Sequence, residues 1–279
     1  MVKYKKRVIK QLKDEDFKKI HNPKRDILEI MDEIEIEYNV KILYCCLTGS
    51  RIYGLEKKDS DYNIRFIFKR PLNDYLTLDK KKNEISYKEF NYECIGWDID
   101  KALKLHYKSN ITLYEWLNST EIYIEDMVKF NSIIDFDKNT LQYSYTKLAK
   151  KNYKKAKTDI PYKITEKQMK QYIYTIRYIL SWNIIHYEQR KPTLNIYELI
   201  DNNENIPSDI LKYIKIFIKS YKKQNYEKIG FIELSNLNAW IYNSIKIMEN
   251  TNPYHPPKRV TMKYHNIKFQ EIIRKSLYP

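Results

Sequence analysis

Two runs of strand-forming residues lie close together near the N-terminus, joined by a segment that contains two of the chain's four glycines. The first run, VKILYCCLT, is almost wholly apolar and ends directly at Gly49, which predicts a buried strand followed by a turn. The second run, DYNIRFIF, alternates apolar residues with Asp61, Asn63 and Arg65. Alternate residues of a strand point to the same face, so we expect these three side chains to lie side by side.

The segments around these runs predict a small unit of helices and strands. Residues 24–39, KRDILEIMDEIEIEYN, carry an apolar stripe with acidic residues between, as an amphipathic helix does. Residues 86–99, SYKEFNYECIGWDI, are a third strand candidate, and DKALKLHYKSN follows as a helix. The order helix, strand, turn, strand, strand, helix predicts an α+β domain over residues 1–135.

Strand patterns fade in the second half of the chain, and helical patterns replace them. SYTKLAKKNYKKAK predicts a strongly basic helix, and TEKQMKQYIYTIRYILSWNIIHYE has apolar residues at helical spacing. SDILKYIKIFIKSYKKQ predicts a helix capped by Ser208, just after Pro207. The prolines of NPYHPPKR end this pattern, and KYHNIKFQEIIRKSLYP is expected to be a docked or partly free tail. We therefore predict a helical domain over residues 136–279.

The chain is strongly basic, with 51 Lys and Arg against 36 Asp and Glu and a net charge of +15. These cations occur together with 27 tyrosines, a combination typical of surfaces that bind phosphates and stack on bases. A Lys, Ile, Asn and Tyr bias from an AT-rich genome explains the composition equally well. Net charge is therefore compatible with nucleic-acid binding but does not establish it.

Other residue types argue against several classes of protein. Three cysteines at no metal-ligand spacing indicate a reducing, cytoplasmic compartment, and the spacing of the five histidines does not suggest zinc. The basic N-terminus, MVKYKKRVIK, does not lead into an apolar segment, and no apolar run approaches 18 residues. We therefore expect neither a signal peptide nor a membrane span.

The two strand runs also place chemical groups that suit phosphoryl transfer. Gly49 and Ser50 end the first strand, ten residues follow, and Asp61 and Asn63 then alternate on the second. A glycine lets backbone N–H groups approach phosphate oxygens, and the serine hydroxyl adds a donor. Two oxygen ligands on alternate residues can hold Mg²⁺, and a third carboxylate from a neighbouring strand would complete a two-metal site.

Three blocks of the sequence resemble one known family. GSRIYGLEKKDSDYNIRFIF is similar to the signature GSRAYGL…SDYDIRGI of nucleotidyltransferases in the DNA polymerase beta superfamily, the RNA repair pathway DNA polymerase beta family. GWDIDKALKLHYKSNITLYEWLNSTEIY is similar to the family's GWDLRKALRLLRKSNPPLLEWLQSPIVY, and KQYIYTIRYILSWNII to its KKYLYALRPLLAARWI. The resemblance implies a nucleotidyltransferase fold, with a mixed sheet flanked by helices, and nucleotide bound between this domain and the helical one.

The resemblance also implies roles for individual residues. Gly49 and Ser50 would bind the β- and γ-phosphates of the nucleotide, and Asp61 would be a metal ligand. Asn63 stands where the family has its second catalytic Asp, so it would be a weaker, uncharged ligand. Three explanations remain open for this amide: an engineered Asp→Asn change that traps a substrate, a natural pseudoenzyme, and a natural active site that tolerates the amide.

The third carboxylate has two candidates. Glu93 matches the first Asp of the family's DINGWDL block and would complete the metal site, although it could instead be a solvated strand residue. Asp98 is the second candidate, and its alternative role is to cap the helix that begins in IDKALKL.

Four cations are candidates for binding the nucleotide. Arg51 and Arg65 lie inside the motif, and Arg65 could instead pair with Asp61. Lys170 and Arg177 match the family's KKYLYALR and would reach the triphosphate from the helical domain, unless they belong to a solvated face. A lysine run, which would follow the phosphates of RNA or simply be solvated, comprises Lys147, Lys150, Lys151, Lys154, Lys155 and Lys157.

The expected reaction follows from this resemblance. With Mg²⁺ or Mn²⁺, a hydroxyl would attack the α-phosphate of an NTP and release pyrophosphate; the acceptor would be the 3′ end of RNA or tRNA, in RNA repair or processing. Two alternatives remain: a catalytically inactive RNA-binding protein with the same fold, and a transferase that modifies a protein hydroxyl.

Overall fold

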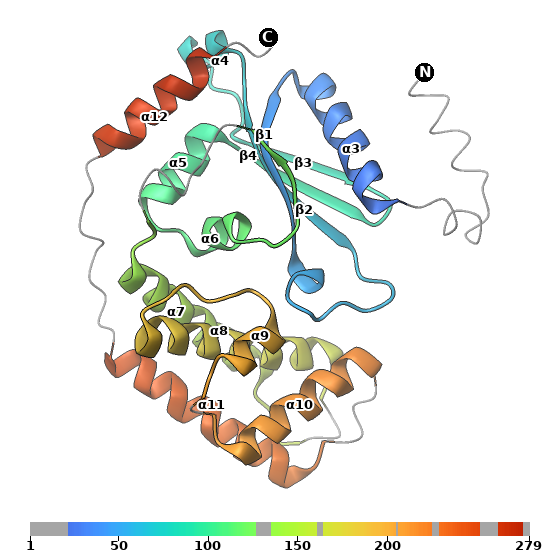
Figure 1. Ribbon diagram of the computed structural model, residues 1–279. Coiled ribbons are helices and arrows are strands. Elements are labelled where there is room, and N and C mark those ends of the chain that lie inside the picture. The colour runs from blue at the N-terminus through green and yellow to red at the C-terminus, as the bar shows by residue number, and fades with distance from the viewer. Residues whose placement is uncertain are drawn as a thin grey trace, which may run out of the picture.

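The computed structural model describes residues 22–126, 135–160, 164–204, 206–224, 229–251 and 262–275. The basic N-terminal stretch and the proline-rich NPYHPPKR lie outside these residues. The described part contains a five-stranded sheet with the order β3-β4-β2-β1-β5, in which only β2 and β4 pair in parallel (Figure 1). The strands are β1 (Lys41–Thr48), β2 (Tyr62–Lys69), β3 (Glu84–Glu89), β4 (Tyr92–Asp98) and β5 (Ile122–Glu125).

Helices cover both faces of the sheet. Helix α3 (Pro23–Tyr38) begins at Asn22, whose side chain accepts a hydrogen bond from the backbone N–H of Arg25, and packs its apolar stripe on one face. Helices α5 (Ile99–Tyr107) and α6 (Ile111–Leu117) pack on the other face (Figure 1). Because β1 lies inside the sheet between these layers, seven of its eight residues are buried, which explains its apolar sequence.

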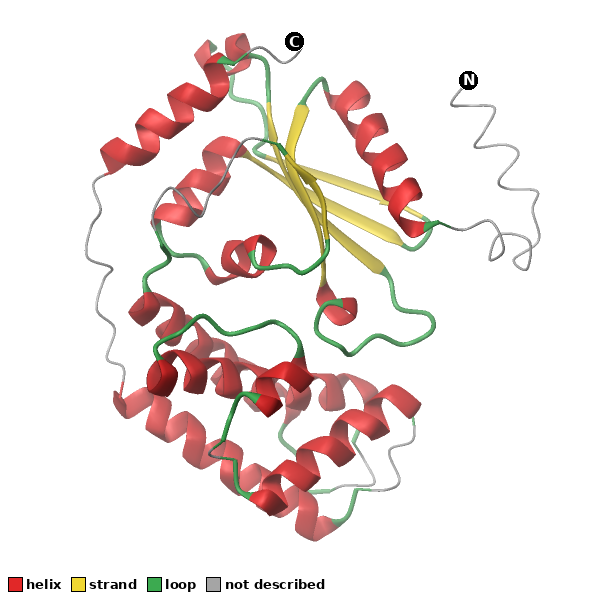
Figure 2. Ribbon diagram, in the orientation of Figure 1, coloured by secondary structure: helices red, strands yellow, loops and turns green. Residues whose placement is uncertain are grey.

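A layer of helices lies below the sheet (Figure 2). Helix α8 is central in it and begins with a capping box formed by Thr165 and Gln168. One hydrophobic cluster runs from the α5–α6 face of the sheet into these helices, so both parts share a core. The division at residue 135 stays a prediction. The layer comprises α7 (Lys138–Ala156), α8 (Glu166–Glu188), α9 (Ile196–Asp201), α10 (Ser208–Lys223) and α11 (Phe231–Thr251).

The last helix, α12 (Met262–Arg274), returns to the sheet and lies beside α5 and the short α4 (Leu72–Leu76) (Figure 1). The ammonium group of Lys69, at the end of β2, donates to the carbonyl oxygens of Ile272 (3.2 Å) and Lys275 (2.8 Å). The C-terminal segment that we expected to be docked or partly free is therefore a docked helix over its described residues.

The mixed sheet and the helical second part confirm the main expectations, with three differences. SYKEFNYECIGWDI forms two strands rather than one, because the chain reverses at Phe90, which has a positive φ of 48°. The four-residue β5 was not predicted. Ser208 is the first residue of α10, and Pro207 occupies the cap position. In the described part of the chain, every helix is too short or too polar to cross a lipid bilayer.

Candidate active site

The turn after β1 is built on Gly49. Gly49 has a φ of +78°, and the backbone then makes a short 3₁₀ turn through Ser50 and Arg51. A Cβ atom at Gly49 would lie 3.0 Å from the amide nitrogen Nδ2 of Asn63, which is tighter than nine in ten real Cβ contacts. Both the backbone conformation and the approach of Asn63 therefore require glycine here.

The paired register of β2 and β4 brings two of the predicted ligands together. Asn63 is the partner of Glu93 in this parallel pair, and Asp61 is exposed and directly precedes β2. The guanidinium of Arg65 lies between Asn63 and Glu93, with its Nη2 atom 3.3 Å from both Asn63 Oδ1 and Glu93 Oε1. Arg65 is thus paired with Glu93, and Glu93 is more than a solvated strand residue.

Asp98 lies at the opposite end of β4. It is five residues beyond Glu93, or about 16 Å along an extended strand. Its buried carboxylate caps α5 by accepting from the backbone N–H of Asp100 (3.0 Å) and also accepts from the hydroxyl of Tyr75 (3.1 Å). Burial raises the pKa of Asp98, although both hydrogen bonds act to lower it. The structure therefore matches the helix-cap interpretation and does not bring Asp98 together with Glu93.

Arg51 closes the loop between the glycine turn and Asp61. Its Nη2 donates to the carbonyl oxygen of Ser60 (2.6 Å), and its guanidinium lies 3.8 Å from the ring centroid of Tyr62. These contacts hold the two ends of the loop together. Arg51 thus positions the loop rather than presenting a free charge.

Arg177 is buried, contrary to the exposed position that contact with a triphosphate would require. Its side chain is 1% exposed, and Nη2 lies 2.8 Å from Oε1 of Glu115 while Nε donates to the carbonyl oxygen of Leu194 (3.0 Å). Its guanidinium also lies 3.8 Å from the ring centroid of Tyr53, whose hydroxyl donates to Glu115 (2.9 Å). Burial acts to lower the pKa of Arg177, but the Glu115 carboxylate raises it overall. The network ties the glycine turn to α6 and α8.

Lys170 lies on the same helix but is partly exposed. Its ammonium group is 5.7 Å from the ring centroid of Tyr174, which in turn makes an edge contact with Tyr53 of the turn segment. Lys170 is therefore near the turn and accessible to a ligand.

Sequence reasoning missed two lysines that hold the loop against the helices. Lys57 forms an ion pair with Glu166 of α8, and Lys222 of α10 donates to the carbonyl oxygen of Gly54 (3.2 Å) and to Glu56 (3.0 Å). The lysines themselves are visible in LEKKDS and SYKKQ, but their partners are more than 100 residues away. The turn thus lies between the sheet and the helical layer (Figure 1).

The donor set can be tested against a divalent ion. Within the described residues, no group of three or more His, Cys, Asp or Glu side chains could hold a metal. The carboxylate of Asp61 and the amide oxygen of Asn63 are hard oxygen ligands of the kind that Mg²⁺ prefers. The predicted set therefore offers hard oxygen ligands at Asp61 and Asn63, but it has one carboxylate fewer than the family pattern.

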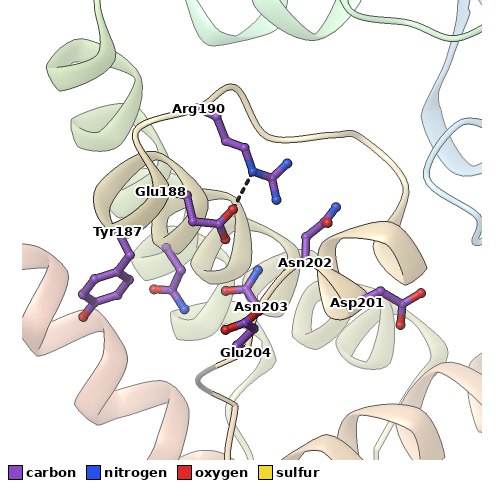
Figure 3. Close-up of a pocket in the computed structure, with 8 residues that line it drawn as sticks. Tyr187, Glu188, Arg190, Asp201, Asn202, Asn203 and Glu204 are labelled. Carbon is purple, nitrogen blue, oxygen red and sulfur yellow. Dashed lines mark hydrogen bonds and ion pairs between the residues drawn. The ribbon is translucent and has the colours of Figure 1, made fainter.

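A separate polar cavity of about 290 Å³ lies at the C-terminal end of α8 (Figure 3). Glu188 and Arg190 pair with each other at its edge. It contains none of the predicted site residues and is not the candidate active site. Its lining comprises Asn183, Tyr187, Glu188, Arg190, Asp201, Asn202, Asn203 and Glu204.

Comparison with known proteins identifies the family. The sequence model of the RNA repair pathway DNA polymerase beta family matches residues 24–267. The chain belongs to this family. The resemblance of the three sequence blocks is thereby confirmed, and with it the α+β fold class of the polymerase beta-like nucleotidyltransferases, which generally use an NTP and a divalent metal.

Several individual proteins are similar to this family member. The uncharacterized protein YcgL of Bacillus subtilis is 30% identical over 195 residues, which cover 68% of this chain and 72% of YcgL. Spectinomycin adenyltransferase AAD(9) from Enterococcus faecialis, solved with ATP and spectinomycin, is 10% identical with a TM-score of 0.45, covering 80% of this chain and 98% of the other. A nucleotidyltransferase-like protein from Exiguobacterium sibiricum is 9% identical with a TM-score of 0.34, covering 87% and 79%.

Proposed function

We propose that this protein is a Mg²⁺-dependent transferase that moves an NMP from an NTP to a hydroxyl at the 3′ end of RNA or tRNA. The observation that carries this proposal is the register that pairs Asn63 with Glu93 and packs the Asn63 amide against Gly49. The backbone proposed to bind phosphates and the oxygens proposed to bind the metal ion are then neighbours, as phosphoryl transfer requires.

Each residue has a defined part in this proposal. The backbone at Gly49 and the hydroxyl of Ser50 bind the terminal phosphates, and Lys170 adds a positive charge from α8. Asp61, with the oxygen of Asn63, would hold Mg²⁺, which neutralises phosphate charge when bound. Arg177 is a positioning residue that fixes the turn through Tyr53.

Basic surfaces on the helical layer support RNA as the acceptor. Exposed lysines recur at helical spacing on one face of α7 and on one face of α10, and α10 is tied to the glycine-turn loop by Lys222. Such rows of charge attract phosphates without reading sequence. The lysines are Lys147, Lys150, Lys151, Lys154 and Lys155 on α7, and Lys212, Lys215, Lys219 and Lys223 on α10.

The reaction can be tested with α-³²P-labelled NTPs, Mg²⁺ or Mn²⁺, and a pool of RNA and tRNA. We expect label in RNA, and more of it with Asn63→Asp, because the added carboxylate restores the family's ligand. Label in protein would instead identify a protein hydroxyl as the acceptor. Absence of transfer by both proteins would refute the proposal.

A catalytically inactive RNA-binding protein is the second candidate, favoured by the uncharged Asn63. This candidate predicts RNA binding that weakens with salt and does not change with Mg²⁺, together with no NTP binding. Filter binding over a salt series, with and without Mg²⁺, separates it from the transferase.

We also infer a reducing, cytoplasmic location. Cys45, Cys46 and Cys94 are all buried and unpaired. Burial raises the pKa of Cys46 and of Cys94 to about 12, so their thiols are unreactive core groups.

A further inference from the structure

One nitrogen of Arg65 occupies a position that suits a bound cation. Nη2 lies 3.3 Å from Asn63 Oδ1 on β2 and 3.3 Å from Glu93 Oε1 on β4. These are two of the three side chains that would hold metal ions in the two-ion arrangement. The guanidinium therefore places a positive charge between the Asn63 and Glu93 side chains.

The backbone holds this guanidinium in place. Its Nη1 donates to the carbonyl oxygens of Ile64 (2.9 Å) and Glu93 (3.1 Å), and the Arg65 side chain is only 15% exposed. These two bonds do not depend on the side chains of Asn63 or Glu93. The charge is therefore a built-in part of the sheet rather than a mobile surface group.

Arg65 also fixes the orientation of the Asn63 amide. Because arginine can only donate, the amide atom that faces it must be the oxygen. The nitrogen Nδ2 is then turned toward Gly49, 3.0 Å from the position a Cβ would occupy there. An N–H donor thus points to the turn that is proposed to bind phosphates, where an aspartate would place a negative oxygen.

We propose that this site binds its nucleotide with a single divalent ion, and that Arg65 and the Asn63 amide replace the second ion. The inference rests on the proposed nucleotide-binding function. Asp61 and Glu93 supply two negative charges and Arg65 returns one positive charge, so the protein adds a net charge of only −1 to the charge of the nucleotide's phosphates, which favours one ion over two. Asn63 is then an adapted residue: one lone pair of its oxygen accepts from Arg65 and the other remains open to the single ion at Asp61, while its nitrogen donates toward phosphate.

The test is to measure the affinity for α,β-methylene-ATP by calorimetry at two concentrations of free Mg²⁺ that differ tenfold. Both concentrations are high enough to saturate the nucleotide with its own Mg²⁺. For the unmodified protein we expect the affinity to change less than twofold. Asn63→Asp, which creates a second ion site, should gain up to tenfold. Asn243→Asp on the exposed face of α11 controls for the added charge and should behave like the unmodified protein.

Ion counting provides a second measurement that does not depend on any variant. With Mn²⁺ in place of Mg²⁺, the electron paramagnetic resonance signal of free Mn²⁺ gives the ions bound per protein–nucleotide complex. One ion is expected. Two ions, or a tenfold affinity gain by the unmodified protein, would overturn this inference and leave the transferase proposal intact, whereas no nucleotide binding by either protein would overturn both.

Discussion

Removing the Arg177 guanidinium should destabilise the fold strongly. Arg177 is 1% exposed and its partner Glu115 is 13% exposed, so Arg177→Met leaves a carboxylate without its counter-charge in a mostly buried place. Breaking such a pair costs about 3–5 kcal/mol. At about 2–4 °C per kcal/mol, the melting temperature should fall by roughly 6–20 °C.

A double-mutant cycle tests this reasoning. Arg177→Met with Glu115→Leu removes both charges, so the double variant should be more stable than Arg177→Met alone. It should retain a residual loss of about 1 kcal/mol because the hydroxyl of Tyr53 loses its acceptor. Urea unfolding of the parent, both single variants and the double variant gives the coupling energy.

Two results would refute the account of Arg177. Additive losses in the cycle would mean that the ion pair does not connect α6 to α8 energetically. Loss of nucleotide binding by the folded double variant, while folded Glu115→Leu still binds nucleotide, would mean that Arg177 contacts the triphosphate directly, as the sequence comparison implied.

Three further predictions concern the turn, the contact of His106 on α5 with His265 on the C-terminal helix α12, and the basic surface. Gly49→Ala should lower the free energy of unfolding by about 1–2 kcal/mol because Gly49 has a positive φ, and it should weaken nucleotide binding. Gly230→Ala is the matched control, because its methyl group would meet only the flexible end of Glu233. Equal stability of the two variants would contradict the tight turn at Gly49. Burial, and then the neighbouring His265, lower the pKa of His106 to about 4, although Asp135 acts to raise it. Below pH 6.5 the His106 side chain therefore binds a proton in the unfolded chain but not in the folded chain. The free energy of unfolding should then fall by about 1 kcal/mol per pH unit down to pH 4, relative to that of His106→Asn, as measured by urea unfolding. Parallel pH profiles of the two proteins would argue against this. Replacing Lys215 and Lys219 by alanine should reduce the salt slope of RNA binding by about 1.4, measured by filter binding; an unchanged slope would remove α10 from the RNA surface.

The local sequence pattern was sufficient to predict the helices and strands whose buried residues recur at a regular spacing. The apolar run of β1, the alternation of β2 and the stripe of α3 were all predicted within a residue or two. The turn at Phe90 was missed because it contains no glycine or proline, although Asn91 follows it. Strand β5 has only four residues, none of them buried, so it carries no periodic signal.

In the candidate site, too, some features could be predicted from the sequence and others could not. The motif and the family blocks predict that Gly49, Asn63 and Glu93 belong to one site, and the structure does bring them together, while their roles stay predictions. The burial of Arg177 could not be predicted from the sequence. Its spacing places it on the same face of α8 as Lys170, but spacing does not say at which residue that face becomes buried. Its partner Glu115 lies 62 residues away, beyond the reach of any local pattern.

Calorimetric titration of each NTP with Mg²⁺, into the parent protein and into Asp61→Asn, tests the proposed nucleotide site most directly. Asp61 is exposed ahead of β2, so this change of one charge should leave the fold intact. We predict that the parent binds at least one NTP and that Asp61→Asn binds it at least tenfold more weakly. Absence of NTP binding by the parent, or equal affinity of the two proteins, would contradict a nucleotide site at the Gly49 turn.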